Sequence, residues 1–250
     1  MTDLRLADLP PQTQALQGRV VLITGASGGI GRAAALHCAE QGATVILVGR
    51  DVKKLEAVYD AIEAAQLPQP AIFELNLKTA NEQHYSALAK VIEAEFGTLD
   101  GLLHNASELG QLCPVEQISP AVWQEVVQVN LSGPFLLTRA LLPLLRKSTA
   151  GRILLTSSSV GRKGRAFWGA YAVSKAGIEN LTQTLADELE TTPIRVNSLN
   201  PGATRTAMRA AAYPAEDPAT VKSAESIAPI YSYLLSDACA LHGQQLSIQH

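Results

Sequence analysis

An apolar segment followed by closely spaced glycines restricts what this chain can fold into. Residues 19–24 are typical of a buried strand, and residues 33–42 are typical of a helix that ends at a glycine. Gly25, Gly29 and Gly31 stand between them. This order of strand, glycine turn and helix lets the backbone approach a pyrophosphate closely and presents helix N–H groups to it. Because a strand and a helix flank the glycines, we interpret them as a dinucleotide site rather than a plain turn.

Strands and helices alternate along the rest of the chain without a linker or an internal repeat. Apolar segments predict seven strands, near residues 19–24, 44–49, 71–75, 100–105, 152–157, 194–199 and 245–248. Buried strands separated by helices need a parallel sheet that is covered on both faces. The sequence therefore predicts one α/β domain over residues 19–250, a doubly wound Rossmann-type sandwich with a seven-stranded sheet. A short tail is expected over residues 1–18.

Composition narrows the class of protein. Of the 250 residues, 47% are hydrophobic and 17% are charged, and the formal net charge of −3 leaves no basic excess for nucleic acid. An apolar leader is missing, and no run of about 18 apolar residues occurs, so we expect a soluble cytoplasmic protein that does not bind membranes. Cys38, Cys113 and Cys239 lack metal-ligand spacing, as do the histidines, so we expect reduced thiols and no metal.

Tyr171 and Lys175 stand four residues apart in a segment that we expect to be helical, so their side chains share one face. A nearby positive charge favours the phenolate and should lower the pKa of Tyr171 toward the range useful for proton transfer. An amphipathic helix can also place an aromatic residue one turn before a lysine without such a role. The pair by itself leaves both interpretations open.

Several motifs in the same order resemble the short-chain dehydrogenase/reductase family. They are Thr24-Gly25-x-x-x-Gly29-x-Gly31, Asn105-Ala106 after a strand, Ser158, Tyr171 with Lys175, and the segment from Asn200 to Thr206. The resemblance covers almost the whole chain. Residues 157–166 and 201–210 are similar to a bacterial subgroup of oxidoreductases called YciK-like. The resemblance implies a nicotinamide cofactor and says almost nothing about the substrate.

The resemblance also implies the roles of four catalytic residues. Ser158 would donate to the substrate oxygen, Tyr171 would exchange the proton, and Lys175 would stabilise the phenolate and bind the nicotinamide ribose. Asn130 would hold a water on its carbonyl and connect Lys175 to solvent. Pro134 agrees with this role, because it has no N–H to donate to the carbonyl four residues earlier. A capping role for Ser158, and simple bonding of Asn130 to a neighbouring loop, remain alternatives.

We expect the cofactor to lie at the carboxyl ends of the strands. The candidate contacts are Gly25, Ser27, Gly29, Ile30, Gly31, Arg50, Asn76, Leu77, Asn105, Ala106, Tyr171, Lys175, Pro201, Gly202, Thr204 and Thr206. The second strand ends at Gly49 and Arg50, where an arginine accommodates the 2′-phosphate of NADP. Asp51 is the competing ligand for the ribose of NAD, but it can equally cap the next helix. We therefore favour NADP(H) over NAD(H), with Arg50 as the clamp and Ser27 as a second donor.

Some positions differ from the family's usual pattern. Asn76 replaces an aspartate that holds the adenine amino group, although its side-chain oxygen can accept the same bond. His104 and Ser107 replace Asn and Gly beside the nicotinamide, and we expect His104 to be packed at a strand end. The substrate lid, near residues 207–221, is short, which suggests an open pocket.

Cations and an aromatic residue surround the expected pocket. Arg162, Lys163, Arg165, Arg205 and Arg209 fall in the loop before Tyr171 or in the lid. They could attract an anionic substrate, but they could equally be solvated or serve an oligomer contact. Trp168 stands one helical turn before Tyr171, where it lines the pocket or packs beneath the loop.

The sequence thus predicts an oxidoreductase that transfers a hydride between NADP(H) and a carbonyl or alcohol substrate, with Tyr171 as general acid and base. The alternative is a nucleotide-binding sensor or interaction module that keeps the fold without the chemistry. Ser158 argues against it, because a pure binding protein has no use for that serine. We also expect a homodimer or homotetramer through the helices that carry Asn130 and Tyr171, with apolar contacts from Val122, Val126, Leu136 and Leu137.

Overall fold

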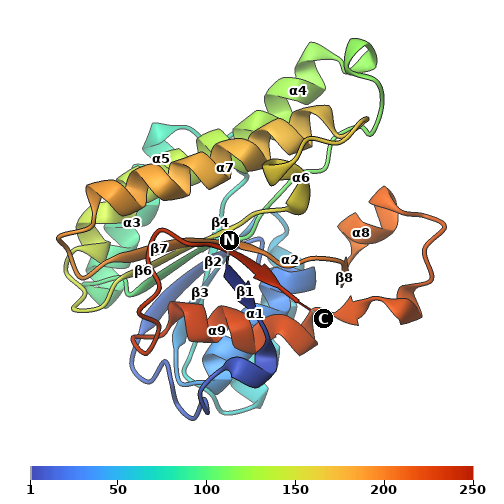
Figure 1. Ribbon diagram of the computed structural model, residues 1–250. Coiled ribbons are helices and arrows are strands. Elements are labelled where there is room, and N and C mark those ends of the chain that lie inside the picture. The colour runs from blue at the N-terminus through green and yellow to red at the C-terminus, as the bar shows by residue number, and fades with distance from the viewer. Residues whose placement is uncertain (1, 250) are drawn as a thin grey trace.

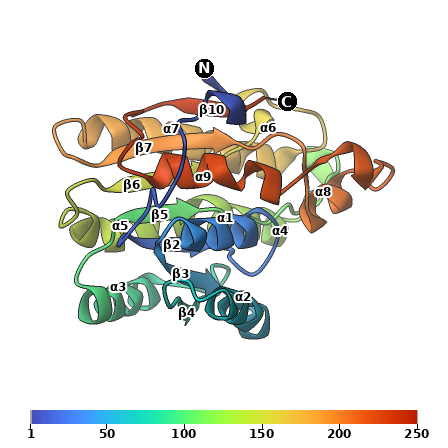
Figure 2. The same ribbon diagram turned by 90° about the horizontal axis from the view of Figure 1, so that it is seen from below.

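A parallel sheet lies between two layers of helices in the computed structural model, which describes residues 2–249 (Figure 1). Within these residues the main sheet has eight strands in the order β1-β10-β7-β6-β5-β2-β3-β4, and neighbouring strands are parallel (Figure 2). The strands are β1 Thr2–Leu4, β2 Val20–Thr24, β3 Thr44–Gly49, β4 Ala71–Glu74, β5 Gly101–His104, β6 Arg152–Thr156, β7 Arg195–Asn200 and β10 Gln245–Ile248. The predicted doubly wound α/β architecture is confirmed.

Helices cover both faces of this sheet. They are α1 Gly29–Glu40, α2 Val52–Ala64, α3 Glu82–Phe96, α4 Pro120–Val127, α5 Gly133–Leu145, α6 Ser159–Arg162, α7 Gly169–Glu188, α8 Ala207–Ala212 and α9 Ala228–Leu235. Helices α3, α5 and α7 pack on one face, and α1, α2 and α9 pack on the other (Figure 1). Short 3-10 turns cover Leu6–Asp8, Val115–Gln117, Pro218–Thr220 and Glu225–Ile227. No helix within residues 2–249 is long and apolar enough to cross a lipid bilayer.

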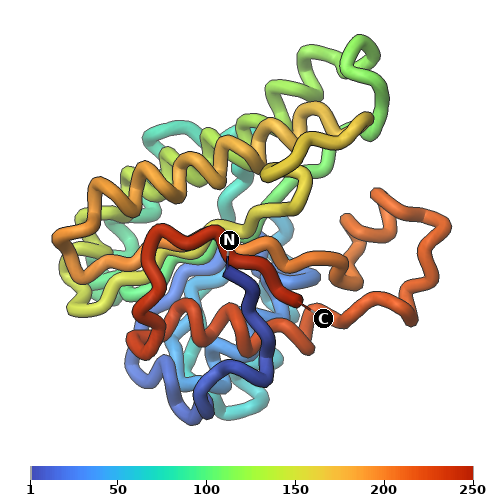
Figure 3. The backbone as a smooth tube through the Cα atoms, in the orientation of Figure 1, coloured from blue at the N-terminus to red at the C-terminus, as the bar shows by residue number. Residues whose placement is uncertain are grey.

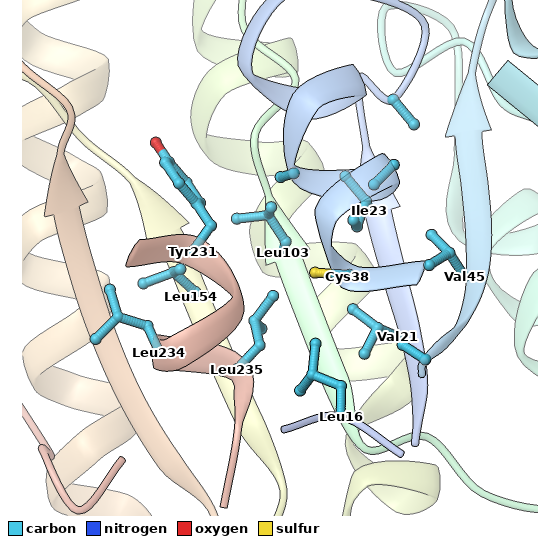
Figure 4. Close-up of a cluster of buried hydrophobic side chains, with 14 of the residues drawn as sticks. Leu16, Val21, Ile23, Cys38, Val45, Leu103, Leu154, Tyr231, Leu234 and Leu235 are labelled. Atoms are coloured by element: carbon cyan, nitrogen blue, oxygen red, sulfur yellow. The ribbon is translucent and has the colours of Figure 1, made fainter. Parts of the chain in front are cut away.

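Alternate side chains of each central strand enter two separate cores. In β2, Val21 and Ile23 join the core beneath α1 and α9, whereas Val20 and Leu22 join the core beneath α3, α5 and α7. Figure 4 shows the first of these cores, in which Cys38 packs among aliphatic side chains. Because both faces are buried, the strands contain continuous apolar runs, which is why their positions could be predicted from the sequence.

The predicted count of seven strands is wrong by one, because the expected tail contributes β1. Thr2, Asp3 and Leu4 pair in parallel with Leu246, Ser247 and Ile248, so the first and last segments lie side by side (Figure 3). The chain between β1 and β2 is also packed against the domain, since Gln12 Nε2 donates to the Pro229 carbonyl at 2.8 Å. Three residues are too few to show a strand period, and their partner is at the other end of the sequence.

The order of the strands reverses between β2 and β5. The chain runs outward through β3 and β4 and then returns to the other side of β2 as β5. A crevice for ligands forms outside the carboxyl ends of the strands at such a switch point. Thr24 joins the two ends there, because its hydroxyl accepts from Asn105 N at 3.0 Å and from Ala106 N at 3.1 Å.

Candidate functional site

The glycine turn between β2 and α1 leaves no room for side chains at two positions. Gly25 has φ +69°, and a Cβ there would lie 2.9 Å from Ala106 Cα. A Cβ on Gly31 would lie 2.2 Å from the Gly25 carbonyl oxygen, so α1 can approach the strand ends only with glycine here. The N-cap residue Gly28 makes no side-chain cap bond, and the first turn of α1 contains no acidic residue. This end of α1 is therefore suited to an anionic group.

Two cavities adjoin this turn. The larger has a volume of about 350 Å³ and is lined, among others, by Gly25, Gly29, Ile30, Asn105, Ala106, Ser158, Tyr171, Lys175, Pro201, Gly202, Thr204 and Thr206. The smaller has a volume of about 190 Å³ and is lined, among others, by Gly25, Ser27, Arg50, Asn76, Leu77 and Ala106. The structure thus brings together the residues predicted to bind the cofactor, although Gly31 lies beneath the turn and not on either cavity wall.

Asp51 and Arg50 have separate surroundings at the end of β3. The Asp51 carboxylate accepts from Lys54 N at 3.2 Å and caps α2, and its pKa is lowered chiefly by its hydrogen bond with the Lys54 side chain. Arg50 lines the smaller cavity, and its Nη1 lies 3.7 Å from Glu108 Oε2. Asp51 therefore has a structural role that needs no ligand, as the capping alternative proposed.

A second cation, Lys78, faces the smaller cavity and was not predicted from the sequence. Its Nζ lies 3.8 Å from Glu108 Oε2 and 2.6 Å from Glu125 Oε1. Arg50 and Lys78 thus share one carboxylate, which shows that this position attracts a negative charge. The Asn76 side-chain oxygen accepts from Lys78 N at 3.1 Å, and it keeps a second lone pair for a ligand. These donors fit an adenosine group with a 2′-phosphate.

Ser158, Tyr171 and Lys175 meet at the larger cavity. Ser158 follows β6 and stands at the N-cap of α6, but its side chain makes no cap bond there, contrary to the capping alternative. Tyr171 and Lys175 are buried on α7, and Lys175 Nζ lies 5.6 Å from the centroid of the Tyr171 ring. The ammonium group donates to the Thr156 carbonyl at 2.8 Å. This contact fixes the lysine beneath the cavity floor.

Burial controls the protonation of both residues. It raises the pKa of Tyr171 to about 12, and the nearby hydroxyl groups of Ser158 and Ser107 oppose that rise. Burial lowers the pKa of Lys175 to about 8, and the charge of Glu179 opposes that fall. The expected lowering of the Tyr171 pKa is therefore wrong for this structure, because desolvation of the phenolate is the largest effect on it. The phenol is protonated at neutral pH.

Replacing Lys175 by methionine should stabilise the fold. The folded pKa of about 8 lies below the ordinary value of 10.5, so the folded chain bears the full cost of the buried charge below pH 8. That cost disappears as the pH rises from 8 to 10.5. After subtraction of the lost hydrogen bond, we expect a gain of about 1–3 kcal/mol in unfolding free energy at pH 7.

Urea denaturation of both proteins at pH 7 and pH 10 measures this effect. The gain should be smaller at pH 10, and the exposed Lys90→Met change should show no such difference. A Lys175→Met variant that is less stable than the wild type at pH 7 would contradict the sign of this prediction.

Asn130 lies in a π-helical turn, Gln128–Ser132, between α4 and α5. Pro134 cannot donate to the Asn130 carbonyl, and the helix widens across these residues, with Gly133 N bonded to the Gln128 carbonyl. The buried Asn130 side chain accepts from Glu108 N at 2.7 Å and donates to the Ser174 hydroxyl at 3.0 Å. The side chain thus bonds to a neighbouring loop, as the alternative interpretation proposed.

Two of the five cations expected near the pocket form ion pairs within the protein. Arg162 Nε donates to Glu179 Oε1 at 3.0 Å, and its other nitrogens bind Ser247 and the Leu246 carbonyl of β10. Arg209 forms a bidentate pair with Glu216. Of the interpretations left open for these cations, attraction of an anionic substrate is not favoured for these two residues, because each charge is matched by a carboxylate from a distant or later segment.

His104 is packed at the end of β5, as expected. Its Nε2 lies 2.8 Å from the Thr138 hydroxyl, and burial, together with the charge of Lys175, lowers its pKa to about 3. Trp168 lines the larger cavity beside Tyr171, so it occupies the pocket wall, which was one of its two predicted positions. Within residues 2–249 we find no group of three or more His, Cys, Asp or Glu side chains arranged to hold a metal ion.

Comparisons with known proteins agree with this site. The site combines a glycine turn, a switch point in the sheet, and the group of Ser158, Tyr171 and Lys175. Residues 19–217 match the family model for short chain dehydrogenases. The chain belongs to the short-chain dehydrogenase family. It is 51% identical over 227 residues to the Escherichia coli (strain K12) protein described as uncharacterized oxidoreductase YciK, which covers 91% of this chain and 90% of that protein. The predicted resemblance to the YciK-like subgroup is confirmed.

Solved structures of other short-chain dehydrogenases have the same fold. One from Pseudomonas syringae has a TM-score of 0.94 and 53% identity, and the match covers 96% of this chain and 98% of that one. One from Escherichia coli CFT073, solved in complex with NADPH, has a TM-score of 0.92 and 49% identity, with 95% and 99% covered. A relative of this chain therefore binds NADPH, and the family is one of oxidoreductases.

The cavity wall of this short-chain dehydrogenase also includes residues that the motifs did not indicate. They are Ser107, Leu109, Met208, Ala212 and Tyr213. Ser107 is noted only as a departure from the family's pattern beside Asn105-Ala106, and the lid residues follow no fixed spacing. Their position depends on how the segment after Thr206 folds back over the cavity.

Proposed function

We propose that this chain is an NADP(H)-dependent dehydrogenase or reductase that acts on a carbonyl or alcohol group. The observation that carries the proposal is the meeting of Ser158, Tyr171 and Lys175 on the cavity that also contains the glycine turn. A nucleotide-binding sensor would need the turn but not a buried phenol and ammonium group beside it. Oxidation of NADPH, followed by its absorbance, over a panel of aldehydes and ketones tests the proposal. If no aldehyde or ketone in the panel oxidises NADPH, the nucleotide-binding sensor is favoured.

Distinct groups would hold each part of the cofactor. The N-terminus of α1 would bind the diphosphate, Arg50 and Lys78 the 2′-phosphate, and Lys175 the nicotinamide ribose. The remaining predicted contacts, from Asn105 to Thr206, would enclose the nicotinamide end. When bound, the cofactor supplies or accepts the hydride at its nicotinamide ring.

The protein's own residues would then orient the carbonyl and move the proton. The Ser158 hydroxyl would donate to the carbonyl oxygen, which polarises the bond. Tyr171 would deliver its phenolic proton to the oxygen as negative charge develops there. Because the pKa of Tyr171 is about 12, the phenol begins in the donor form that carbonyl reduction requires. Lys175, with a pKa of about 8, would replace the proton, and we propose that the Asn130 carbonyl connects it to solvent.

Arg50→Ala should weaken the binding of NADPH much more than the binding of NADH. Loss of a charge-assisted contact to the 2′-phosphate should raise the Kd for NADPH about tenfold or more and change that for NADH less than about threefold. Thermal shifts of the wild type and the variant with each cofactor give the measurement. The exposed neighbour Lys53→Ala is the matched control. Equal shifts of the wild type with NADPH and NADH would refute the role of Arg50.

We also propose a homo-oligomer through α4, α5 and α7, which lie together on one side of the molecule (Figure 1). Two of the residues predicted to form this contact cannot do so, because Val126 and Leu137 are fully buried within the chain. Exposed apolar side chains on these helices are instead Trp123, Phe135 and Val173. A dimer would remove them from water.

Phe135→Glu should convert the oligomer into a monomer, because a charge in the middle of an apolar contact must be desolvated without a partner. Light scattering at working concentration gives the mass, and Val91→Glu, at another exposed apolar position, is the control that should not change it. A monomeric wild type would refute the proposal.

A further inference from the structure

Apolar side chains from three segments gather beside Tyr171 at one end of the larger cavity. Trp168 precedes α7, Leu109 follows β5, and Met208 and Tyr213 belong to the lid. The ring centroid of Trp168 lies 5.8 Å from that of Tyr171 and 5.8 Å from that of Tyr213. The rings touch at tilted angles of 58° and 41°, so they form one continuous wall rather than a slot between parallel rings.

Two arginines hold the lid end of this wall in place. The Arg209 guanidinium lies 3.7 Å from the centroid of the Tyr213 ring, and Arg165 Nη1 donates to the Tyr213 hydroxyl at 2.9 Å. Arg165 belongs to the loop between α6 and α7, whereas Tyr213 follows α8, which projects from the body of the sheet (Figure 1). The contact therefore bridges the two sides of the cavity mouth. A ring held in this way presents a preorganised surface to a ligand.

The arginine that lines this wall, Arg209, is paired with a carboxylate. Arg209 Nε donates to Glu216 Oε2 at 2.7 Å, and Nη2 donates to the other carboxylate oxygen. A carboxylate on the ligand would have to compete with this bidentate pair and would be repelled by Glu216. Arg162 is directed to Glu179, away from the cavity. The exposed Lys163 and Arg205 do not line the cavity.

We propose that this cavity binds an uncharged carbonyl compound that carries an apolar ring, an inference that rests on the proposed function. The ring would lie against Trp168 and Tyr213, and the carbonyl would reach Ser158 and Tyr171. The cavity volume of about 350 Å³ also includes the nicotinamide end, so the space beside the wall suits one substituted ring rather than a long chain. Specificity would come from apolar contact with these rings and from the pairing of Arg209, the arginine on the cavity wall, with Glu216.

A matched pair of aldehydes tests the ligand class. The compounds 4-isopropylbenzaldehyde and 4-formylbenzoate have similar shapes and differ in the charge of one substituent. Calorimetric titration into the NADP⁺ complex measures binding without turnover, because NADP⁺ cannot reduce an aldehyde. We expect the isopropyl compound to bind at least about tenfold more tightly, since its apolar group is buried and the carboxylate must be desolvated.

Variants of the wall and of the ion pair sharpen the test. Tyr213→Ala should weaken binding of 4-isopropylbenzaldehyde about tenfold, whereas Tyr213→Phe, which keeps the ring, should change it less than about threefold. Glu216→Gln releases Arg209 and should strengthen binding of 4-formylbenzoate about tenfold without affecting the neutral aldehyde. Lys163→Ala, on the exposed part of the loop, should affect neither compound.

Binding and turnover separate this inference from the proposed function. Equal or tighter binding of 4-formylbenzoate to the wild type, or no binding of either aldehyde, would overturn the ligand class. If NADPH is nevertheless oxidised by carboxylated aldehydes, the oxidoreductase proposal stands. Tighter binding of the neutral aldehyde supports the ligand class even if no carbonyl oxidises NADPH, and in that case the oxidoreductase proposal fails.

Discussion

Tyr171→Phe should lower kcat/KM for carbonyl reduction by about 10²–10⁴-fold, the usual contribution of a positioned general acid. The change removes the phenolic proton and keeps the ring that packs against Trp168. The affinity for NADPH should therefore stay within about twofold, so that the loss lies in transition-state stabilisation rather than in cofactor binding. Steady-state rates of NADPH oxidation and fluorescence titration of the cofactor provide the two measurements.

Tyr213→Phe is the matched control for this experiment. It removes a hydroxyl from the same cavity, but that hydroxyl accepts a hydrogen bond from Arg165 and has no proposed role as an acid. Its kcat should remain within about threefold of the wild type. If Tyr171→Phe retains a comparable kcat, another group is the acid, and the protonated Lys175 or Ser158 would have to be considered.

Arg162→Met should destabilise the fold by about 3–5 kcal/mol, because it leaves a buried carboxylate without its partner. The side chains of Arg162 and Glu179 are 15% and 5% exposed, so water cannot replace the lost contact. The arginine also binds Ser247 Oγ at 2.6 Å and the Leu246 carbonyl at 2.7 Å, which fastens β10 to the segment after Ser158. Urea denaturation measures the loss as a lower midpoint.

The neighbouring Lys163→Met change is the control, since Lys163 is exposed and should alter stability by less than about 0.5 kcal/mol. A double variant, Arg162→Met with Glu179→Gln, should recover part of the loss because no unpaired charge remains. A loss below about 1 kcal/mol in Arg162→Met would show that the pair behaves as an exposed ion pair.

The strands and the position of the site could be predicted because both depend on local patterns. The central strands β2, β5 and β6 are buried on two faces, so their apolar runs are visible in the sequence. Parallel strands have their carboxyl ends at one edge, so Gly25, Asn105 and Ser158 could be placed together before any contact was known. Strand β1 has no such pattern, because its pairing depends on the free edge of β10.

Properties that depend on tertiary partners could not be predicted. The sequence shows that Arg162 and Arg209 are positive, but not that Glu179 and Glu216 lie against them. The effect of Lys175 on the pKa of Tyr171 could be argued from their spacing, whereas the opposing effect of burial is the sum of contacts from several segments. Tyr213 is placed by the fold of the lid, which carries no motif.

The pairing of β1 with β10 determines which part of the sheet can form first. Its contacts join residues such as Thr2 and Leu246, so they close a loop that contains nearly the whole chain. Such a loop has a large closure entropy, so this pairing is slow to form. The cofactor crevice between β2 and β5 needs no such delay. The part of the sheet around β2 and β5 can therefore form first. The edge formed by β1 and β10 closes last, and it can open without disturbing the crevice between β2 and β5.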